Sequence, residues 1–119
     1  MMRRVWLAIL SATLLLTLSF AQKNKATTYS GEIMDSQCAA MNGHEMMMKD
    51  ENAKDAKDCT VKCVQDGGKY ALYDAKTKSA YSLDDQAKAK EFAGQNVKVE
   101  GTLDKSGKTI HVRAISPAS

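Results

Sequence analysis

The sequence predicts a mainly β fold: a small five-stranded OB-like barrel, with a short helix between strands 3 and 4 and a cysteine-containing helical insertion after strand 1. Short stretches of alternating apolar and polar residues recur along the chain, and polar or glycine-containing turns separate them. A cysteine-bearing segment interrupts this alternation after the first stretch. At 119 residues, the chain has room for one domain but not for the separate cofactor lobe of a larger enzyme.

Residues 1–21 have the layout of a secretory signal peptide. Arg3 and Arg4 precede an apolar stretch, and Ser19 and Ala21 follow it at the small-x-small spacing of a cleavage site. We therefore expect export to the periplasm or the extracellular space, with no stable membrane insertion after cleavage. Without the two arginines the chain has 15 basic and 14 acidic residues, and this net charge of +1 does not favour nucleic-acid binding.

The predicted domain spans residues 27–116. A polar leader, residues 22–26, precedes it, and a tail of residues 117–119 follows. The first strand is expected over residues 27–34, where β-forming residues alternate and Gly31 permits a bend.

The strand pattern is lost in residues 35–68, which we predict to be the insertion. It holds a run of three methionines and a segment rich in lysine and acidic residues. Asp58 is suited to cap a short helix over residues 59–66, and Gly67 and Gly68 would end that helix.

Alternation resumes after the insertion. Residues 69–73 and 80–83 flank a polar turn and predict a hairpin. A helix is expected over residues 86–92, capped by Asp84 or Asp85.

The last two strands are expected over residues 96–103 and 109–115, joined by a turn. The residues predicted to face the core are Val97, Val99 and Leu103 in the first, and Ile110, Val112 and Ala114 in the second.

Cys38, His44, Cys59 and Cys63 all lie in the insertion. Three thiolates and one imidazole are sufficient for a tetrahedral metal site of the Cys₃His type. Cys59 and Cys63 are four residues apart, so a helix places both on one face. Zinc is the favoured ion.

The neighbouring methionines make copper possible as well. Thioethers are soft ligands that select Cu(I), and four methionines stand close to His44 in the sequence: Met41, Met46, Met47 and Met48. Clusters of methionine are also common as flexible apolar packing. His111 is interpreted as an exposed strand residue, since its neighbours Ile110 and Val112 face the core.

A disulfide is the alternative to a metal site. Exported proteins commonly pair their cysteines, and a bond from Cys38 to Cys59 or Cys63 would tie the insertion to the first strand and leave one cysteine over. A bond between Cys59 and Cys63 within one helix would be strained. In this alternative the protein is a disulfide-stabilised OB-like binding or structural module of the cell envelope with no metal.

No catalytic motif stands out in the sequence. It lacks C-x-x-C-H, H-E-x-x-H, G-x-S-x-G and the glycine-rich nucleotide-binding patterns. We therefore expect a non-enzymatic protein without catalytic residues, whose partner is an unidentified envelope protein or small ligand and not a nucleic acid.

Three motifs carry a resemblance to a known family. They are Gly31-x-x-x-Asp35-x-x-Cys38 followed by His44, then Cys59-Thr60-x-x-Cys63-Val64-x-x-Gly67-x-Lys69-Tyr70-x-Leu72, then Phe92-Ala93-Gly94-x-x-Val97-x-Val99-x-Gly101-Thr102-Leu103. Together they resemble a family of small exported bacterial proteins of unknown function. The resemblance covers nearly all of the predicted mature chain. It implies an OB-like barrel behind a signal peptide, and it brings no established activity. The sequence departs from the family pattern at Ala39-Ala40 and in the methionine-rich stretch.

Overall fold

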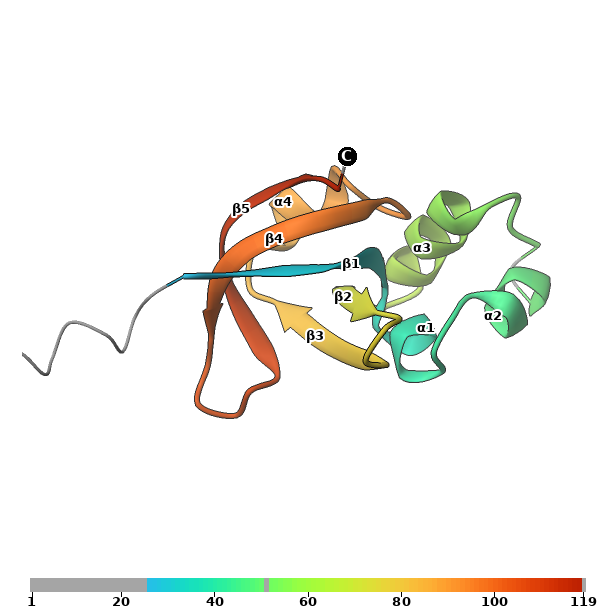
Figure 1. The fold of residues 1–119 in the computed structure, drawn as a ribbon. Coiled ribbons are helices and arrows are strands. Elements are labelled where there is room, and N and C mark those ends of the chain that lie inside the picture. Colours follow the sequence, from blue (N-terminus) through green and yellow to red (C-terminus); the bar gives the residue numbers. More distant parts are fainter. Residues whose placement is uncertain (1–25, 51, 119) are drawn as a thin grey trace, which may run out of the picture.

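Five strands close into a barrel in the computed structural model, which describes residues 26–50 and 52–118 (Figure 1). The strands are neighbours in the order β1, β2, β3, β5, β4, and β4 pairs again with β1. Their bounds are β1 (Thr27–Asp35), β2 (Tyr70–Asp74), β3 (Ser79–Leu83), β4 (Asn96–Leu103) and β5 (Thr109–Pro117). This closed ring of five strands confirms the predicted OB-like class. The predicted signal peptide lies outside the described residues.

The strand pairs are antiparallel with one exception, the parallel pairing of β3 with β5. That contact is short, with Ser82 opposite Thr109 and Leu83 opposite Ile110. The polypeptide between these strands contains α4 (Gln86–Lys90) and then β4.

Alternate strand residues fill the barrel, because successive side chains of a strand point to opposite faces. The largest of these are completely or almost completely buried, and burial of each such side chain stabilises the fold by about 1.5–3 kcal/mol. They are Ile33, Leu72, Leu83, Val97, Val99 and Ile110.

The last two strands depart from the predicted alternation at one point. The pairing shifts between Glu100, which lies opposite Ala114, and Gly101, which lies opposite Val112, so one residue of β5 has no partner. Such a bulge exchanges the inner and outer faces beyond it. Ala114 is therefore exposed, and Ile115 packs against the core in its place.

Leu103 was also predicted to face the core, and this was wrong. It is the last residue of β4, next to the turn, and its side chain is 38% exposed.

The helix between β3 and β4 is fixed by hydrogen bonds at its first residue. The side-chain Nε2 of Gln86 donates to the backbone carbonyls of Tyr70 and Leu83 at 2.9 and 2.8 Å. Its Oε1 atom accepts from the Tyr70 backbone N–H at 2.8 Å. Asp85 caps the helix, since its Oδ1 atom accepts a 3.0 Å hydrogen bond from the Lys88 backbone N–H. The helix is shorter than the predicted range of residues 86–92.

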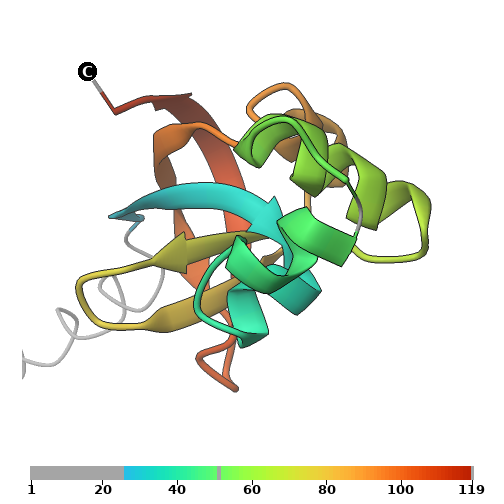
Figure 2. The same ribbon diagram turned by 90° about the vertical axis from the view of Figure 1, so that its right-hand side faces the viewer.

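Three helices form the insertion, where the sequence predicted one. They are α1 (Ser36–Ala40), α2 (Glu45–Asp50) and α3 (Ala56–Gln65), and they lie together over one end of the barrel (Figures 1 and 2). The third begins three residues earlier than predicted because Asp55, not Asp58, is its N-cap and accepts from the Asp58 backbone at 2.8 Å. In the described residues, no helix has the length and hydrophobicity needed to cross a bilayer.

Gly94 lies where the insertion meets the barrel. Its backbone N–H donates to the carbonyl of Ile33 at 2.7 Å. Its φ of +76° favours glycine, and a Cβ atom at this position would lie 2.5 Å from the backbone of Lys57 in α3. The close approach of α3 to the barrel therefore depends on the absence of a side chain here.

We expect Gly94→Ala to destabilise the protein more than Gly107→Ala does. Gly107 also has positive φ, at +72°, but a Cβ atom there would meet nothing within 4 Å, so this control isolates the backbone cost of about 1–2 kcal/mol. The contact with Lys57 should add roughly 1–3 kcal/mol. Urea unfolding of both variants measures the difference, and equal losses would contradict a tight packing of α3 at this point.

Candidate metal centre

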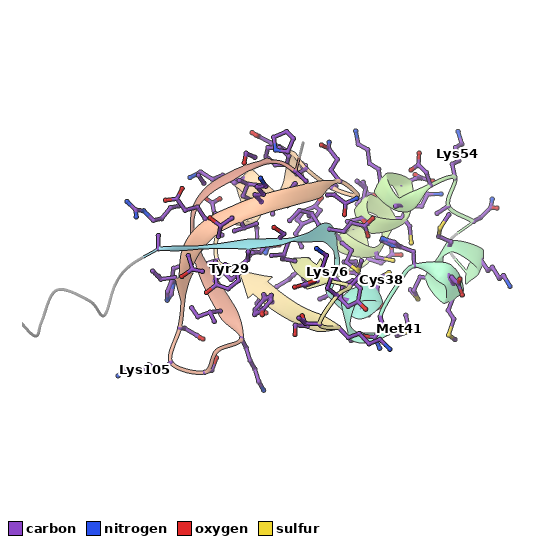
Figure 3. All side chains as sticks on the ribbon, viewed as in Figure 1. Tyr29, Cys38, Met41, Lys54, Lys76 and Lys105 are labelled. Atoms are coloured by element: carbon purple, nitrogen blue, oxygen red, sulfur yellow. The ribbon has the colours of Figure 1, made fainter. Side chains whose placement is uncertain are left out.

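Three cysteine side chains meet between the insertion and the barrel. Cys38 comes from α1 (Figure 3). Cys59 and Cys63 come from α3. Their Sγ atoms all lie within 4.8 Å of one another. Exposed fractions of 0% for Cys38 and Cys59 and 4% for Cys63 show that the group is closed off from water.

Asp35 fixes the position of Cys38. Its Oδ2 atom accepts hydrogen bonds from the backbone N–H groups of Gln37, at 2.8 Å, and Cys38, at 3.3 Å, so it caps α1 directly after β1 ends. An aspartate is among the best residues for this role. Asp35 is itself completely buried, and its Oδ1 atom has no hydrogen-bond partner among the described residues.

Helix α3 supplies the other two thiols from one face. Cys59 and Cys63 stand one turn apart, with the buried Thr60 beside them. The C-terminal end of the helix is tied down because the Gly68 backbone N–H donates to the Cys63 carbonyl at 3.0 Å. The adjoining chain also binds α1, since the Ser36 N–H donates to the Lys69 carbonyl at 2.8 Å.

The residues around the thiols are apolar and rich in sulfur. Strands β1 and β2 contribute the buried Met34, Ala71 and Tyr73, and α1 adds Ala39. Three partly buried side chains also pack against this cluster: Met47, Met48 and Ala53.

This burial acts on the ionisation of the thiols. Burial first, and then the neighbouring Cys59, raises the pKa of Cys38 far above its usual range and that of Cys63 to about 11. The carboxylate of Asp35 also raises the pKa of both thiols. In the absence of a cation these thiols therefore carry protons at neutral pH, and a bound metal ion would replace the protons.

His44 does not join the three thiols in the structure. In the described part of the chain, the group of potential ligand atoms within 4.8 Å of one another consists of the three cysteines. The Nε2 atom of His44 instead lies 2.6 Å from Oε2 of Glu32 on β1. The imidazole is 12% exposed, and its Nδ1 atom is buried without a hydrogen-bond partner among the described residues.

The pair of His44 and Glu32 lines a cavity of about 430 Å³ beside the thiol cluster. Met34 and Tyr73 belong both to the wall of this cavity and to the packing around the cysteines. Glu32 was not singled out from the sequence, because a glutamate at an outward position of a strand is ordinary. Only the fold brings it to a histidine twelve residues away.

The disulfide considered from the sequence, from Cys38 to Cys59 or Cys63, is not formed: all three cysteines are free thiols. His111 is exposed on β5, as expected. Its Nδ1 atom lies 3.1 Å from Asp84, whose carboxylate also accepts the Val112 backbone N–H at 2.8 Å.

The comparisons with known proteins found one family model, and the function of that family is unknown. A family model described as "Protein of unknown function (DUF5818)" matches residues 63–118, which include the last cysteine and strands β2 to β5. The match agrees with the resemblance to a family of unknown function. No curated protein and no solved structure matches the chain significantly.

The raised pKa of Cys63 predicts that the metal-free protein loses stability in alkali. Well below pH 9.0 this thiol is protonated in both states, whereas from around pH 9.0 to about 11 it ionises in the unfolded chain and keeps its proton in the folded one. The folded state then binds more protons, so the free energy of unfolding falls as the pH rises. Unfolding of the reduced, chelator-treated protein at pH 8 to 11 measures the slope. A Cys63→Ala variant with the same slope would contradict this prediction.

Proposed function

We propose that this protein binds a thiophilic metal ion, with zinc favoured, through Cys38, Cys59 and Cys63. The observation that carries the proposal is the convergence of three buried Sγ atoms within 4.8 Å. We propose further that the protein acts as an exported, non-enzymatic metal-binding protein. Support for export comes from the leader-like sequence of residues 1–21.

The spacing of the sulfur atoms fits an ion. Zinc binds thiolate sulfur at about 2.3 Å, so ligands in a tetrahedron around it stand roughly 3.8 Å apart. Sulfur atoms that already lie within 4.8 Å of one another need to move by only about 1 Å to reach that spacing.

The charge balance also supports a cation. Three thiolates beside the buried carboxylate of Asp35 would repel one another strongly in a site without water. A divalent cation offsets much of that charge. It would also join α1 to α3, so that binding would contribute to the stability of the insertion.

Copper(I) is the second candidate, and one observation favours it. The thioether-bearing side chains of Met34, Met47 and Met48 pack against the thiol cluster. Soft thiolate and thioether ligands select Cu(I).

A Cys59→Ser variant tests the proposal. We expect the wild-type protein, isolated without chelator or reductant, to carry one ion per chain with three reduced thiols. The variant should lose that ion, because a hydroxyl is a much poorer ligand for a soft metal. Native mass spectrometry together with elemental analysis reports the ion and the thiols in one sample.

Ala71→Ser is the matched control. Ala71 is 5% exposed in the same cluster, so this change also buries a hydroxyl but removes no thiol. It should retain the ion. A wild-type protein without metal, two daltons lighter because of a disulfide, would contradict the proposal, as would a Cys59→Ser variant with undiminished metal content.

The double variant Met47→Leu with Met48→Leu separates the two ions. Leucine keeps the apolar packing but removes both sulfur atoms. If thioethers are ligands, the affinity for Cu(I) should fall at least tenfold while zinc affinity stays unchanged. Competition titrations with chromophoric chelators measure both, and equal Cu(I) affinities would exclude these methionines as ligands.

A further inference from the structure

We infer that His44 is the fourth ligand of the bound ion, through Nδ1, and that Glu32 orients the imidazole for this role. The inference rests on the proposed function and completes it: three thiolates and one imidazole form the tetrahedral set that structural zinc sites use. Glu32 is then a positioning residue that acts through His44.

The contact between His44 and Glu32 has the form that supports a metal ligand. Metal-binding histidines commonly donate their second ring N–H to a carboxylate, which fixes the tautomer and raises the basicity of the ligating nitrogen. Here Nε2 lies 2.6 Å from Oε2 of Glu32. With the proton on Nε2, the Nδ1 atom carries a free lone pair.

The environment of Nδ1 is the second observation. This atom is buried, and no hydrogen-bond partner for it exists among the described residues. Buried polar atoms are nearly always paired, because an unpaired one loses its bonds to water without replacement. A metal ion would satisfy the lone pair.

The position of His44 in the fold connects it with the thiols. The backbone N–H of Gly43, the preceding residue, donates to the carbonyl of Cys38 at 2.9 Å. The cavity that His44 lines shares Met34 and Tyr73 with the packing around the cysteines. His44 therefore lies on the short connection that follows the helix of Cys38, and its imidazole lines a cavity whose wall includes two residues that pack on the thiol cluster.

A change in the conformation of that connection would bring Nδ1 to the ion. Asn42 and Gly43 have φ values of +63° and +154°, so α1 and α2 are joined by a turn and not by a continuous helix. The turn is held by the Gly43–Cys38 bond, by a 3.3 Å bond from the Asn42 N–H to the Ala39 carbonyl and by a 3.3 Å bond from the Tyr73 hydroxyl to Asn42, and the His44 carbonyl accepts from the Met48 N–H at 2.8 Å. Rotation of the His44 side chain and a shift of this turn, with Glu32 following on its own flexible side chain, are what the approach of the ring requires.

X-ray absorption of the zinc-loaded wild-type protein tests the inference directly. We expect three sulfur ligands and one imidazole nitrogen. The cobalt(II)-loaded protein should show the visible absorption of a tetrahedral site. A zinc site with three or more sulfur atoms and no imidazole would overturn the role of His44 and leave the proposed function intact.

Two variants test the separate roles. Glu32→Gln should weaken the affinity for cobalt(II) by about 10–100-fold, the usual effect of losing such a carboxylate partner, and leave the ligand set unchanged. His44→Ala should weaken the affinity further and replace nitrogen by oxygen in the absorption spectrum. Glu45→Gln and His111→Ala, both at exposed positions, are the controls and should bind as the wild type does.

If the contact between His44 and Glu32 only stabilises the fold, the variants should give a different result. In that case Glu32→Gln and His44→Ala lower the melting temperature of the metal-free protein and leave cobalt affinity and spectrum unchanged, which would overturn the inference. If a variant fails to fold, the absorption spectrum of the wild-type protein decides alone. A wild-type protein that binds neither zinc nor cobalt would overturn the proposed function, and this inference with it.

Discussion

The packing of α1 and α3 around three buried cysteines, against the outer face of β1 and β2, is the contact on which the insertion depends. The barrel has its own core, made mainly of branched aliphatic side chains together with Tyr70 of β2. The buried residues that the insertion contributes to its own core are Cys38, Ala39, Cys59 and Cys63, with Met47, Met48 and Ala53 partly buried around them. Because these buried side chains are small, the apolar area that they bury is modest. A metal ion bound by the three sulfur atoms would therefore contribute a large share of the stability of the insertion.

Strand β1 serves both cores at once. Ile33 points into the barrel, while the next residue, Met34, packs on the cysteine cluster, and Leu72 and Ala71 of β2 do the same on the paired strand. Both faces of these strands are therefore covered, which is unusual for an antiparallel sheet, whose second face more often meets water. Through these strands the thiol cluster rests on a rigid support rather than on a loop.

The sequence was sufficient for the barrel because strand alternation is a local signal with a strict period. It failed at Ala114 and Ile115, where the bulge in β5 is set by pairing with β4 and leaves no mark in β5 itself. In the insertion, the sequence predicted that Cys59 and Cys63 share one helix face near Cys38, and the structure brings these three thiols together without His44, whereas two short helices without apolar periodicity were missed. The contact between Glu32 and His44 forms only because the chain after α1 returns over β1, so no local sequence pattern could have predicted it.

The complete burial of Cys38 and Cys59 bears on how fast a metal ion could enter or leave the proposed site. Among the described residues, both thiols are 0% exposed, covered by the packing of α1 and α3 against β1 and β2 and by the partly buried methionines of α2. Release of an ion from such a buried centre would require local opening of these helices, a motion slower than ligand exchange at an open site. A long residence time of this kind suits retention or structural support better than rapid transfer to another protein.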